Sequence, residues 1–363
     1  MTIVRRTCIV LLALSGCSHS DAFTPHDFGT GLPLAGGPPV RLTYSSGPDL
    51  SPTWLPDGSA IAYSYAEGGR DGDRCIGILP WTGGTRSREI CSHGAFSGDS
   101  TDVFAWPAVS SDGVLAYHRT ARRIGALVNP TGPLVTAPLI TPEAQAVAQE
   151  FPLSAGGVLY NGPANVRWLG PDFLVYLGMV NTDYRPCDTC QFASVRLGHD
   201  VLVTDAAAGL SSLVPGTAYA TSVSPGETPD VIYFTCPNST KVFRRALAAG
   251  IESVAYDFGA GGIARDVHVA AGRVVAVVGG RVDVFFDGPV TVQIDAGGRL
   301  FVADIGGQPR ELTAERTLFR HPSLSPDGSH VAAEGYPFTT FQVGARVDTT
   351  IAAIGDLFRL DTP

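Results

Sequence analysis

The chain has 363 residues and a formal net charge of −9, with 25 Lys and Arg against 34 Asp and Glu residues. An acidic chain without a basic run excludes functions that depend on phosphate contacts with nucleic acid or on electrostatic attachment to anionic lipid. The 43 glycines and 27 prolines, which separate short apolar runs, indicate many strands joined by tight turns.

The first 16 residues have the pattern of a secretory signal peptide. Arg5 and Arg6 precede an apolar run over residues 8–14 that is too short to span a bilayer. The tetrad Leu14-Ser15-Gly16-Cys17 resembles the bacterial lipobox, in which the cysteine is lipidated and becomes the mature N-terminus. The alternative is an ordinary signal peptide followed by a chance cysteine.

The lipobox resemblance implies a lipid anchor on Cys17 and a location in the bacterial cell envelope. Ser18 follows the cysteine, which favours the outer membrane, facing the periplasm. Cleavage removes Arg5 and Arg6 and makes the net charge about −11, so the acyl chains must hold the protein at the membrane. We expect residues 1–16 to be the lipoprotein signal peptide and residues 17–35 a flexible tether.

Two sequence segments near opposite ends of the chain carry the same motif. Residues 51–63 and 321–333 each place Pro-Asp-Gly between short apolar runs, as a tight turn between two strands requires. Weaker versions put turns near residues 113, 172, 226 and 272, with a step of about 54 residues. Repetition at this period predicts a β-propeller of six blades, in which Asp57, Asp112, Asp172 and Asp327 are turn residues and no catalytic set.

The two ends of the repeat region complement each other. Residues 36–43 have the form of an outer hairpin strand, as residues 306–313 do, but no strand precedes them to pair with. Residues 356–361 end the chain on a strand that lacks its outer partner. We therefore expect residues 39–43 to form the outer strand of the last blade and to close the ring.

The repeated Pro-Asp-Gly phrase resembles the TolB-like, PD40 or WD40-like propeller repeats over about residues 36–361. The resemblance implies an all-β fold: a six-bladed β-propeller of four-stranded antiparallel blades over residues 36–363, closed by the N-terminal outer strand. It carries information about the fold. It brings no catalytic nucleophile, because the Gly-x-Ser-x-Gly motif of the related peptidases is missing from the sequence.

The cysteines of the mature chain are interpreted first as structural. Cys75 and Cys91 fall opposite each other on two adjacent strands of the first blade, which predicts a disulfide in an oxidising compartment. Cys187 and Cys190 lie in a long connection of the third blade and favour a loop-stapling disulfide, either within the motif or to Cys236. The alternatives are a redox motif, which normally opens a helix, or a zinc site, which needs two more ligands.

The sequence contains no strong catalytic or metal-binding motif. The sequence has no phosphate loop and no His-Glu-x-x-His, and its histidines are scattered, so we expect no catalytic residue, no metal and no cofactor. Acidic residues at positions 71, 73, 99 and 102 suit a calcium site, although exposed hairpin tips explain them as well. A short helix is expected from Thr141-Pro142 to about Glu150.

Two long connections of the third and sixth blades, residues 178–199 and 335–355, are expected to face each other across one mouth of the ring. Residues 281–298 form either another long connection or an extra hairpin. Aromatic and arginine side chains on the two facing connections are candidate binding residues, unless they pack their own loops: Tyr184, Arg185, Phe192, Tyr336, Phe338 and Phe341.

Three classes of function follow from these patterns. The first is a membrane-anchored, non-enzymatic propeller lipoprotein that binds an envelope protein, a peptide or an envelope polymer at its long-loop face. The second is a hydrolase or lyase that acts on glycans in the propeller mouth and needs carboxylates or histidines converging there. The third is a structural propeller, or the vestige of a sensor propeller lost from a larger receptor. The missing catalytic motifs favour the first class.

Overall fold

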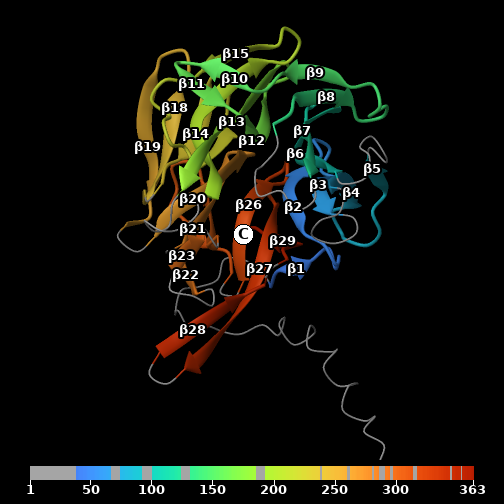
Figure 1. Cartoon of the computed structure of the whole chain (residues 1–363). Helices are drawn as coiled ribbons and strands as arrows, with labels where there is room; N and C mark the ends of the chain where they lie inside the picture. Colours follow the sequence, from blue (N-terminus) through green and yellow to red (C-terminus); the bar gives the residue numbers. More distant parts are fainter. Residues whose placement is uncertain are drawn as a thin grey trace, which may run out of the picture.

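The computed structural model describes residues 38–66, 74–91, 100–123, 131–184, 193–237, 239–259, 262–279, 282–285, 291–294, 297–313, 317–343, 346–352 and 354–363. The described residues form an all-β fold whose antiparallel strands group into four-stranded blades, arranged around a centre in Figure 1. The first two blades are also joined by one parallel pair, Arg74 with Val103. No helix in this part of the chain is long and apolar enough to cross a membrane.

Each blade is built from an innermost to an outermost strand, and blades 1 to 3 follow the chain order. Blade 1 comprises β2 (Asp49–Trp54), β3 (Ala60–Ala66), β4 (Arg74–Pro80) and β5 (Arg88–Ile90). Blade 2 comprises β6 (Ser100–Val109), β7 (Val114–Arg123), β8 (Leu134–Pro138) and β9 (Ala146–Gln149). Blade 3 comprises β12 (Gly162–Leu169), β13 (Phe173–Tyr184), β14 (Ala193–Asp205) and β15 (Leu210–Leu213).

Blades 4 to 6 repeat the pattern, with one exception at the end of the chain. Blade 4 comprises β16 (Ser222–Pro225), β17 (Val231–Thr235), β18 (Lys241–Ala246) and β19 (Ile251–Asp257). Blade 5 comprises β20 (Ile263–Ala270), β21 (Arg273–Gly279), β24 (Arg299–Asp304) and β25 (Arg310–Glu311). Blade 6 comprises β26 (Thr317–Leu324), β27 (His330–Val343), β29 (Asp356–Asp361) and, from the start of the chain, β1 (Val40–Arg41).

The two ends of the propeller pair with each other as the sequence predicts. Val40 lies opposite Arg359 and Arg41 opposite Phe358 in an antiparallel ladder. The backbone N–H of Leu42 donates to the carbonyl oxygen of Leu357 over 2.7 Å. The innermost strands contact one another in the cyclic order β2, β6, β12, β16, β20, β26 and back to β2, which fits the expected closed ring of six blades.

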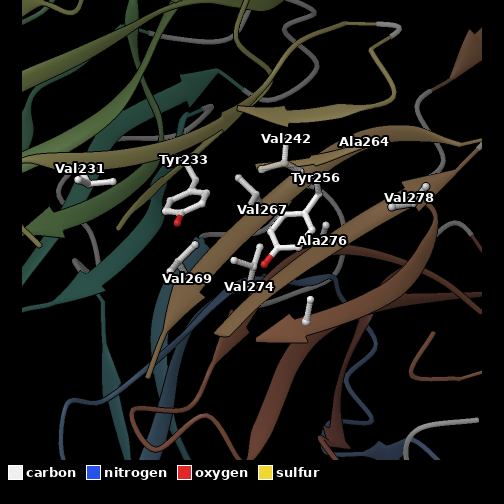
Figure 2. Close-up of a cluster of buried hydrophobic side chains, with 11 residues drawn as sticks. Val231, Tyr233, Val242, Tyr256, Ala264, Val267, Val269, Val274, Ala276 and Val278 are labelled. Atoms are coloured by element: carbon white, nitrogen blue, oxygen red, sulfur yellow. The ribbon is translucent and has the colours of Figure 1, made fainter. Parts of the chain in front are cut away.

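The hydrophobic core is divided among the interfaces between blades. Six clusters of buried apolar side chains each draw on two neighbouring blades, including one between blade 6 and blade 1. Figure 2 shows the cluster between blades 4 and 5, where Tyr233 and Tyr256 meet the valines of β20 and β21. Because both faces of a blade are covered, its strands are apolar on both sides. This explains the short continuous apolar runs of the sequence.

The Pro-Asp-Gly phrases form the tight turns between the first two strands of their blades. In blade 1, Gly58 has a φ of 71° and Asp57 Oδ1 accepts a hydrogen bond from the backbone N–H of Ser59 over 2.9 Å. In blade 6, Asp327 makes the same contact with the N–H of Ser329 over 3.0 Å. These aspartates are turn residues, as expected, because their carboxylates accept hydrogen bonds from the backbone of the turn.

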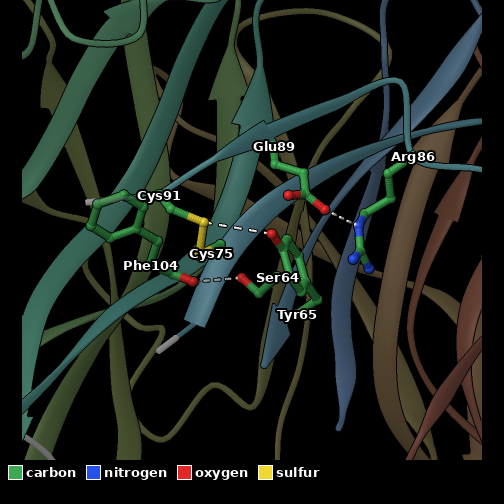
Figure 3. Close-up of a disulfide and its surroundings, with 7 residues drawn as sticks. All are labelled: Ser64, Tyr65, Cys75, Arg86, Glu89, Cys91 and Phe104. Carbon is green, nitrogen blue, oxygen red and sulfur yellow. Dashed lines mark hydrogen bonds and ion pairs between the residues drawn. A yellow bond between two sulfur atoms is a disulfide. The ribbon is translucent and has the colours of Figure 1, made fainter. Parts of the chain in front are cut away.

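A disulfide joins Cys75 of β4 to Cys91, the residue after β5, with a Cα–Cα distance of 4.8 Å. In Figure 3 the hydroxyl of Tyr65 lies 3.5 Å from Cys91 Sγ, and the Arg86 guanidinium lies 4.0 Å from the centre of the Tyr65 ring. The bridge ties the outermost strand of blade 1 to its neighbour. This strand is only three residues long, so the bridge compensates for a short ladder.

The helix expected from Thr141 to Glu150 is wrong. The backbone of Thr141 and Ala144 makes turn hydrogen bonds, and Ala146–Gln149 then form β9, which pairs with β8. Thr141-Pro142 therefore opens a turn and not a helix. The local capping signal is overridden because blade 2 needs an outermost strand at this point of the repeat.

Three hairpins extend the plain four-stranded pattern. β10 (Leu153–Ala155) pairs with β11 (Val158–Tyr160) between blades 2 and 3, a hairpin that the sequence did not indicate. β22 (Val282–Phe285) pairs with β23 (Thr291–Ile294) inside the stretch for which an extra hairpin was one alternative. β28 (Arg346–Ile351) pairs with the far half of β27 and projects from the body of the molecule in Figure 1.

Candidate functional site

The innermost strands are interrupted at the same level around the ring. Register shifts in β2, β6, β12, β20 and β26 mark a β-bulge in five of the six blades. Four residues at these bulges have left-handed backbones: Ser51, Trp106, Asn165 and His321, with φ between 45° and 58°. A bulge redirects the side chain that it carries, and bulges and strained backbones are frequent at functional sites, so this level of the ring is the candidate site.

Two of the redirected side chains meet across the ring. The rings of Trp106 and His321 have centroids 4.7 Å apart in an edge-to-face contact. Trp106 belongs to blade 2 and His321 to blade 6, and blade 1 lies between these two. Side chains of blades that are not neighbours reach each other only over the axis of the ring. The contact therefore places both rings at the centre of the propeller.

Glu334 of β27 organises this centre. Its Oε1 accepts hydrogen bonds from the backbone N–H of Ser51 over 2.5 Å and from His321 Nδ1 over 2.6 Å. Its Oε2 accepts a bond from the hydroxyl of Tyr336 over 3.0 Å. Asp266 of β20 completes the group, because its Oδ2 accepts the backbone N–H of His321 over 3.1 Å. The axial network, as we call Ser51, Trp106, Asp266, His321, Glu334 and Tyr336, thus links blades 1, 2, 5 and 6.

The charges of the axial network support one another. Burial opposes protonation of His321, but the nearby Glu334 and Asp266 carboxylates outweigh it and raise the pKa of the imidazole. Burial also opposes ionisation of Glu334, yet the His321 charge and the Ser51 N–H outweigh it and lower the pKa of this carboxyl. The two groups therefore form a buried ion pair at acidic to neutral pH.

A second perturbed carboxyl lies on the same innermost strand as Ser51. Asp49 is fully buried, and burial raises its pKa to about 6 although Ser45 Oγ donates to Asp49 Oδ2 over 2.7 Å. Its backbone N–H donates to the carbonyl oxygen of Gly355 over 3.0 Å, which ties β2 to the start of β29. A carboxyl with this pKa exchanges its proton near neutrality, which acid–base chemistry requires and which also couples the fold to pH.

Of the predicted binding residues, two are described with their side chains. Tyr336 is half-buried and belongs to the axial network, with the Arg320 guanidinium 5.5 Å from the centre of its ring. Phe338 is half-buried at the start of the β27–β28 hairpin. Tyr184 ends β13 opposite Ala193, and Phe341 lies opposite Asp348, but both side chains lie outside the described part of the structure.

The remaining predicted site residues lie outside the described residues: Cys17, Arg185, Cys187, Cys190 and Phe192. Their roles stay predictions. Cys236 lies among the described residues as a free thiol, and burial raises its pKa. No group of three or more metal-ligating side chains comes together among the described residues.

The sequence patterns do not predict the axial network, although they contain one signal of it. Ser51, Trp106 and His321 each precede a proline at the corresponding point of their blades. Proline has no N–H for the ladder, so a proline at a repeated place within an innermost strand indicates a bulge. Scattered histidines were interpreted as structural, and the contacts of His321 agree with that interpretation.

No protein-family model and no curated protein sequence matches this chain. Solved structures do match its fold. A gluconolactonase from Xanthomonas campestris is 12% identical, covers 92% of this chain and 97% of its own, and has a TM-score of 0.54. A calcium-binding protein, regucalcin, from Agrobacterium tumefaciens is 13% identical, covers 91% and 95%, and has a TM-score of 0.51. A putative TolB from the same organism is 15% identical, covers 89% and 93%, and has a TM-score of 0.47.

The sheet topology and the two closer likenesses confirm the predicted propeller fold. At these identities they say nothing of function, because one propeller architecture supports enzymes and binding proteins alike.

Proposed function

We propose that this chain is a lipid-anchored propeller of the bacterial envelope, attached through Cys17, that binds a protein, a peptide or an envelope polymer without chemical turnover. The binding face is the one that carries the long connections of blades 3 and 6. The observation that supports this most is the course of β27, which belongs to blade 6 for only part of its length.

The first half of β27 is part of the ring, and the second half leaves it. His330–Gly335 pair with β29, whereas Phe338–Val343 pair with β28 alone among the described strands. A two-stranded ribbon is marginally stable in water by itself. Its cross-strand pairs are uncharged at Thr339–Thr350 and Thr340–Thr349, and Thr339, Thr340 and Thr350 are exposed. A ribbon of this kind gains most from a partner that covers it or adds a strand to its edge.

The axial network supports binding over catalysis. Glu334 already accepts hydrogen bonds from three donors, and its pKa is lowered. A carboxylate held in this way is a weak base, because three of its roughly four acceptor positions are occupied and its proton affinity is reduced. The network therefore serves to hold blades 1, 2, 5 and 6 in register under the binding face.

The hairpin can be removed without disturbing the ring. The backbone N–H of Ala352 donates to the carbonyl oxygen of Pro337 over 2.8 Å, so an Asn-Gly turn can join these residues in place of the segment between them. We compare proteins captured from envelope extract by the unmodified chain, by this deletion, and by Ser111→Lys at the turn between β6 and β7. The turn between the first two strands of a blade and the connection between its second and third strands lie at opposite ends of the blade, because neighbouring strands are antiparallel. Ser111 is therefore on the face opposite the β27–β28 hairpin.

The proposal expects one or more specific components that the unmodified chain and Ser111→Lys retain and the deletion loses. Equal capture by the deletion would contradict the assigned face, and no specific component at low or moderate salt would contradict the binding function. Anchoring is tested separately. Cys17→Ser should abolish incorporation of labelled palmitate and release the protein from the membrane, whereas a Cys17→Ser variant that stays acylated would refute the lipobox assignment.

A second candidate function is glycan hydrolysis or lysis in the propeller mouth. One observation favours it: carboxylates and an imidazole do converge on the axis, at Asp266, His321 and Glu334. The test is release of reducing ends from envelope polysaccharides by the unmodified chain and by His321→Gln. Release that His321→Gln abolishes, in a variant that keeps its fold, would replace the binding proposal.

A further inference from the structure

The centre of the ring contains a cation that the axial network does not use. Arg167 lies on the innermost strand of blade 3, opposite Val175, and is only 4% exposed. Among the described residues, its guanidinium donates one hydrogen bond, from Nη1 to the carbonyl oxygen of Val166 over 2.9 Å. Its Nε is buried without any partner. A guanidinium has five N–H donors, and the one on Nε is unsatisfied at this site.

The surroundings of Arg167 place it toward the axis. The Asp266 carboxylate acts on the Arg167 charge, and that charge in turn lowers the pKa of His268; both residues belong to blade 5, although blade 4 lies between. Asp266 does not form an ion pair with it: Asp266 Oδ2 instead accepts the N–H of His321 over 3.1 Å. Arg167 therefore has a carboxylate in its electrostatic environment but no carboxylate in contact with it.

His268 offers a second donor at the same centre. Its Nδ1 accepts a hydrogen bond from the backbone N–H of Leu324 over 3.1 Å. Burial, together with the Arg167 charge, lowers the pKa of His268 to about 3, so the ring is neutral at physiological pH. With Nδ1 acting as acceptor, the proton of the neutral ring is on Nε2, which makes Nε2–H a donor.

An unsatisfied guanidinium at this depth requires compensation, because buried charges in native proteins are paired or hydrogen-bonded. The planar fork of arginine matches the two oxygens of a carboxylate. The nearby carboxylate of Asp266 disfavours a ligand that carries two negative charges. A singly charged carboxylate therefore satisfies the centre best.

We propose that the axis of the ring holds a binding site for a small monovalent carboxylate, with the Arg167 guanidinium as its principal contact and His268 Nε2–H as a second donor. The site is separate from the β27–β28 hairpin and does not depend on the partner proposed for that hairpin. It links blade 5 to blade 3, which has no residue in the axial network.

The probe is ¹³C-labelled acetate, whose NMR line width is followed as it is titrated against the full-length protein. Arg167→Met keeps most of the side-chain volume and removes the charge. Arg244→Met is the matched control, because Arg244 is a surface residue of β18 that pairs with Glu227. We expect saturable broadening with the unmodified chain and Arg244→Met, and at least about tenfold weaker binding with Arg167→Met. Sulfate at equal ionic strength should not displace acetate.

Two results would overturn the proposal: broadening that does not saturate with the unmodified chain, or equal binding by Arg167→Met. Displacement by sulfate would overturn the preference for a single charge. If Arg167→Met does not fold, crystals of the unmodified protein grown with 3-bromopropionate decide the question. An anomalous bromine peak whose carboxylate contacts Arg167 supports the site, and the absence of such a peak overturns it.

Discussion

Replacing Glu334 with Gln tests the ion pair at the centre of the ring. The amide keeps the shape of the side chain and an acceptor oxygen for the Ser51 N–H, but it removes the charge that pairs with His321. Glu334 is 1% exposed, so the discount for solvent screening of surface pairs does not apply. Breaking a buried charge pair by changing one partner costs about 3–5 kcal/mol. We expect the lower end, about 3 kcal/mol, because the amide retains hydrogen bonds at neutral strength.

The pH dependence distinguishes the ion pair from a loss of packing. The raised pKa of His321 means that its stabilisation is complete below its ordinary value of 6.5 and is lost as the pH rises through the value in the folded state. The lowered pKa of Glu334 means that its stabilisation is present above 4.5 and is lost on acidification below that. The pair therefore stabilises the fold in full between these two values.

The assay is urea unfolding followed by tryptophan fluorescence at about pH 5.5 and about pH 9. We expect Glu334→Gln to cost about 3 kcal/mol at the lower pH and about 1–2 kcal/mol at the higher. Glu227→Gln is the control, because Glu227 also accepts from a tyrosine hydroxyl and a cation, but its cation is Arg244, which does not titrate in this range. Its cost should stay below about 1 kcal/mol at both pH values. A cost for Glu334→Gln that does not change with pH would refute the reasoning.

Three further changes have effects that the structure predicts. Asp49→Asn should leave the free energy of unfolding unchanged near pH 4 and raise it by about 1–3 kcal/mol at pH 7.5. The reason is that the raised pKa of Asp49 makes the contribution of this carboxyl to stability disappear as the pH rises through about 6. Urea midpoints at the two pH values check this, and a destabilised variant at pH 7.5 would contradict it. Replacing both Cys75 and Cys91 with Ala should lower the free energy of unfolding by about 3 kcal/mol, since the bridge closes a loop with a sequence separation of 16. Reducing the disulfide of the unmodified chain should lower it by the same amount. A variant as stable as the oxidised protein would show that the bridge contributes nothing. Arg167→Met should stabilise the fold by about 1–3 kcal/mol in carboxylate-free buffer, because it removes a buried charge with an unsatisfied donor. Thermal melts measure this change. A loss of stability of similar size would mean that Arg167 is satisfied within the protein.

The fold could be predicted from the sequence because the turn motifs that specify it are local and repeated. Pro-Asp-Gly specifies a turn through the backbone preferences of three residues, and repetition of the turn indicates radial symmetry. The pairing of Val40 and Arg41 with β29 was predictable because one strand at each end lacked a partner. The segment after Thr141 shows the limit of local signals, since the ladder of blade 2 decided its structure.

The site was harder to predict, because it consists of residues from blades that are distant in the sequence. Trp106 and His321 are separated by more than half of the chain and meet only because the ring closes. Neither Glu334 nor Arg167 belongs to a recognisable sequence motif. Their roles depend on burial and on which hydrogen-bond partners surround them. Such burial is set by the assembled ring. Tyr336 was selected as an aromatic of a long connection, and the structure gives it a place in the axial network.

Photo-crosslinking in living cells tests the proposed binding most directly. A photoreactive residue is placed at Thr340, which is exposed on the β27–β28 hairpin, and separately at Ser111, which is exposed on the opposite face. We predict a discrete crosslinked product from Thr340 and none from Ser111. Adducts from Ser111 but not from Thr340, or no adduct from either position in a correctly anchored and folded protein, would contradict the binding face on which the account depends.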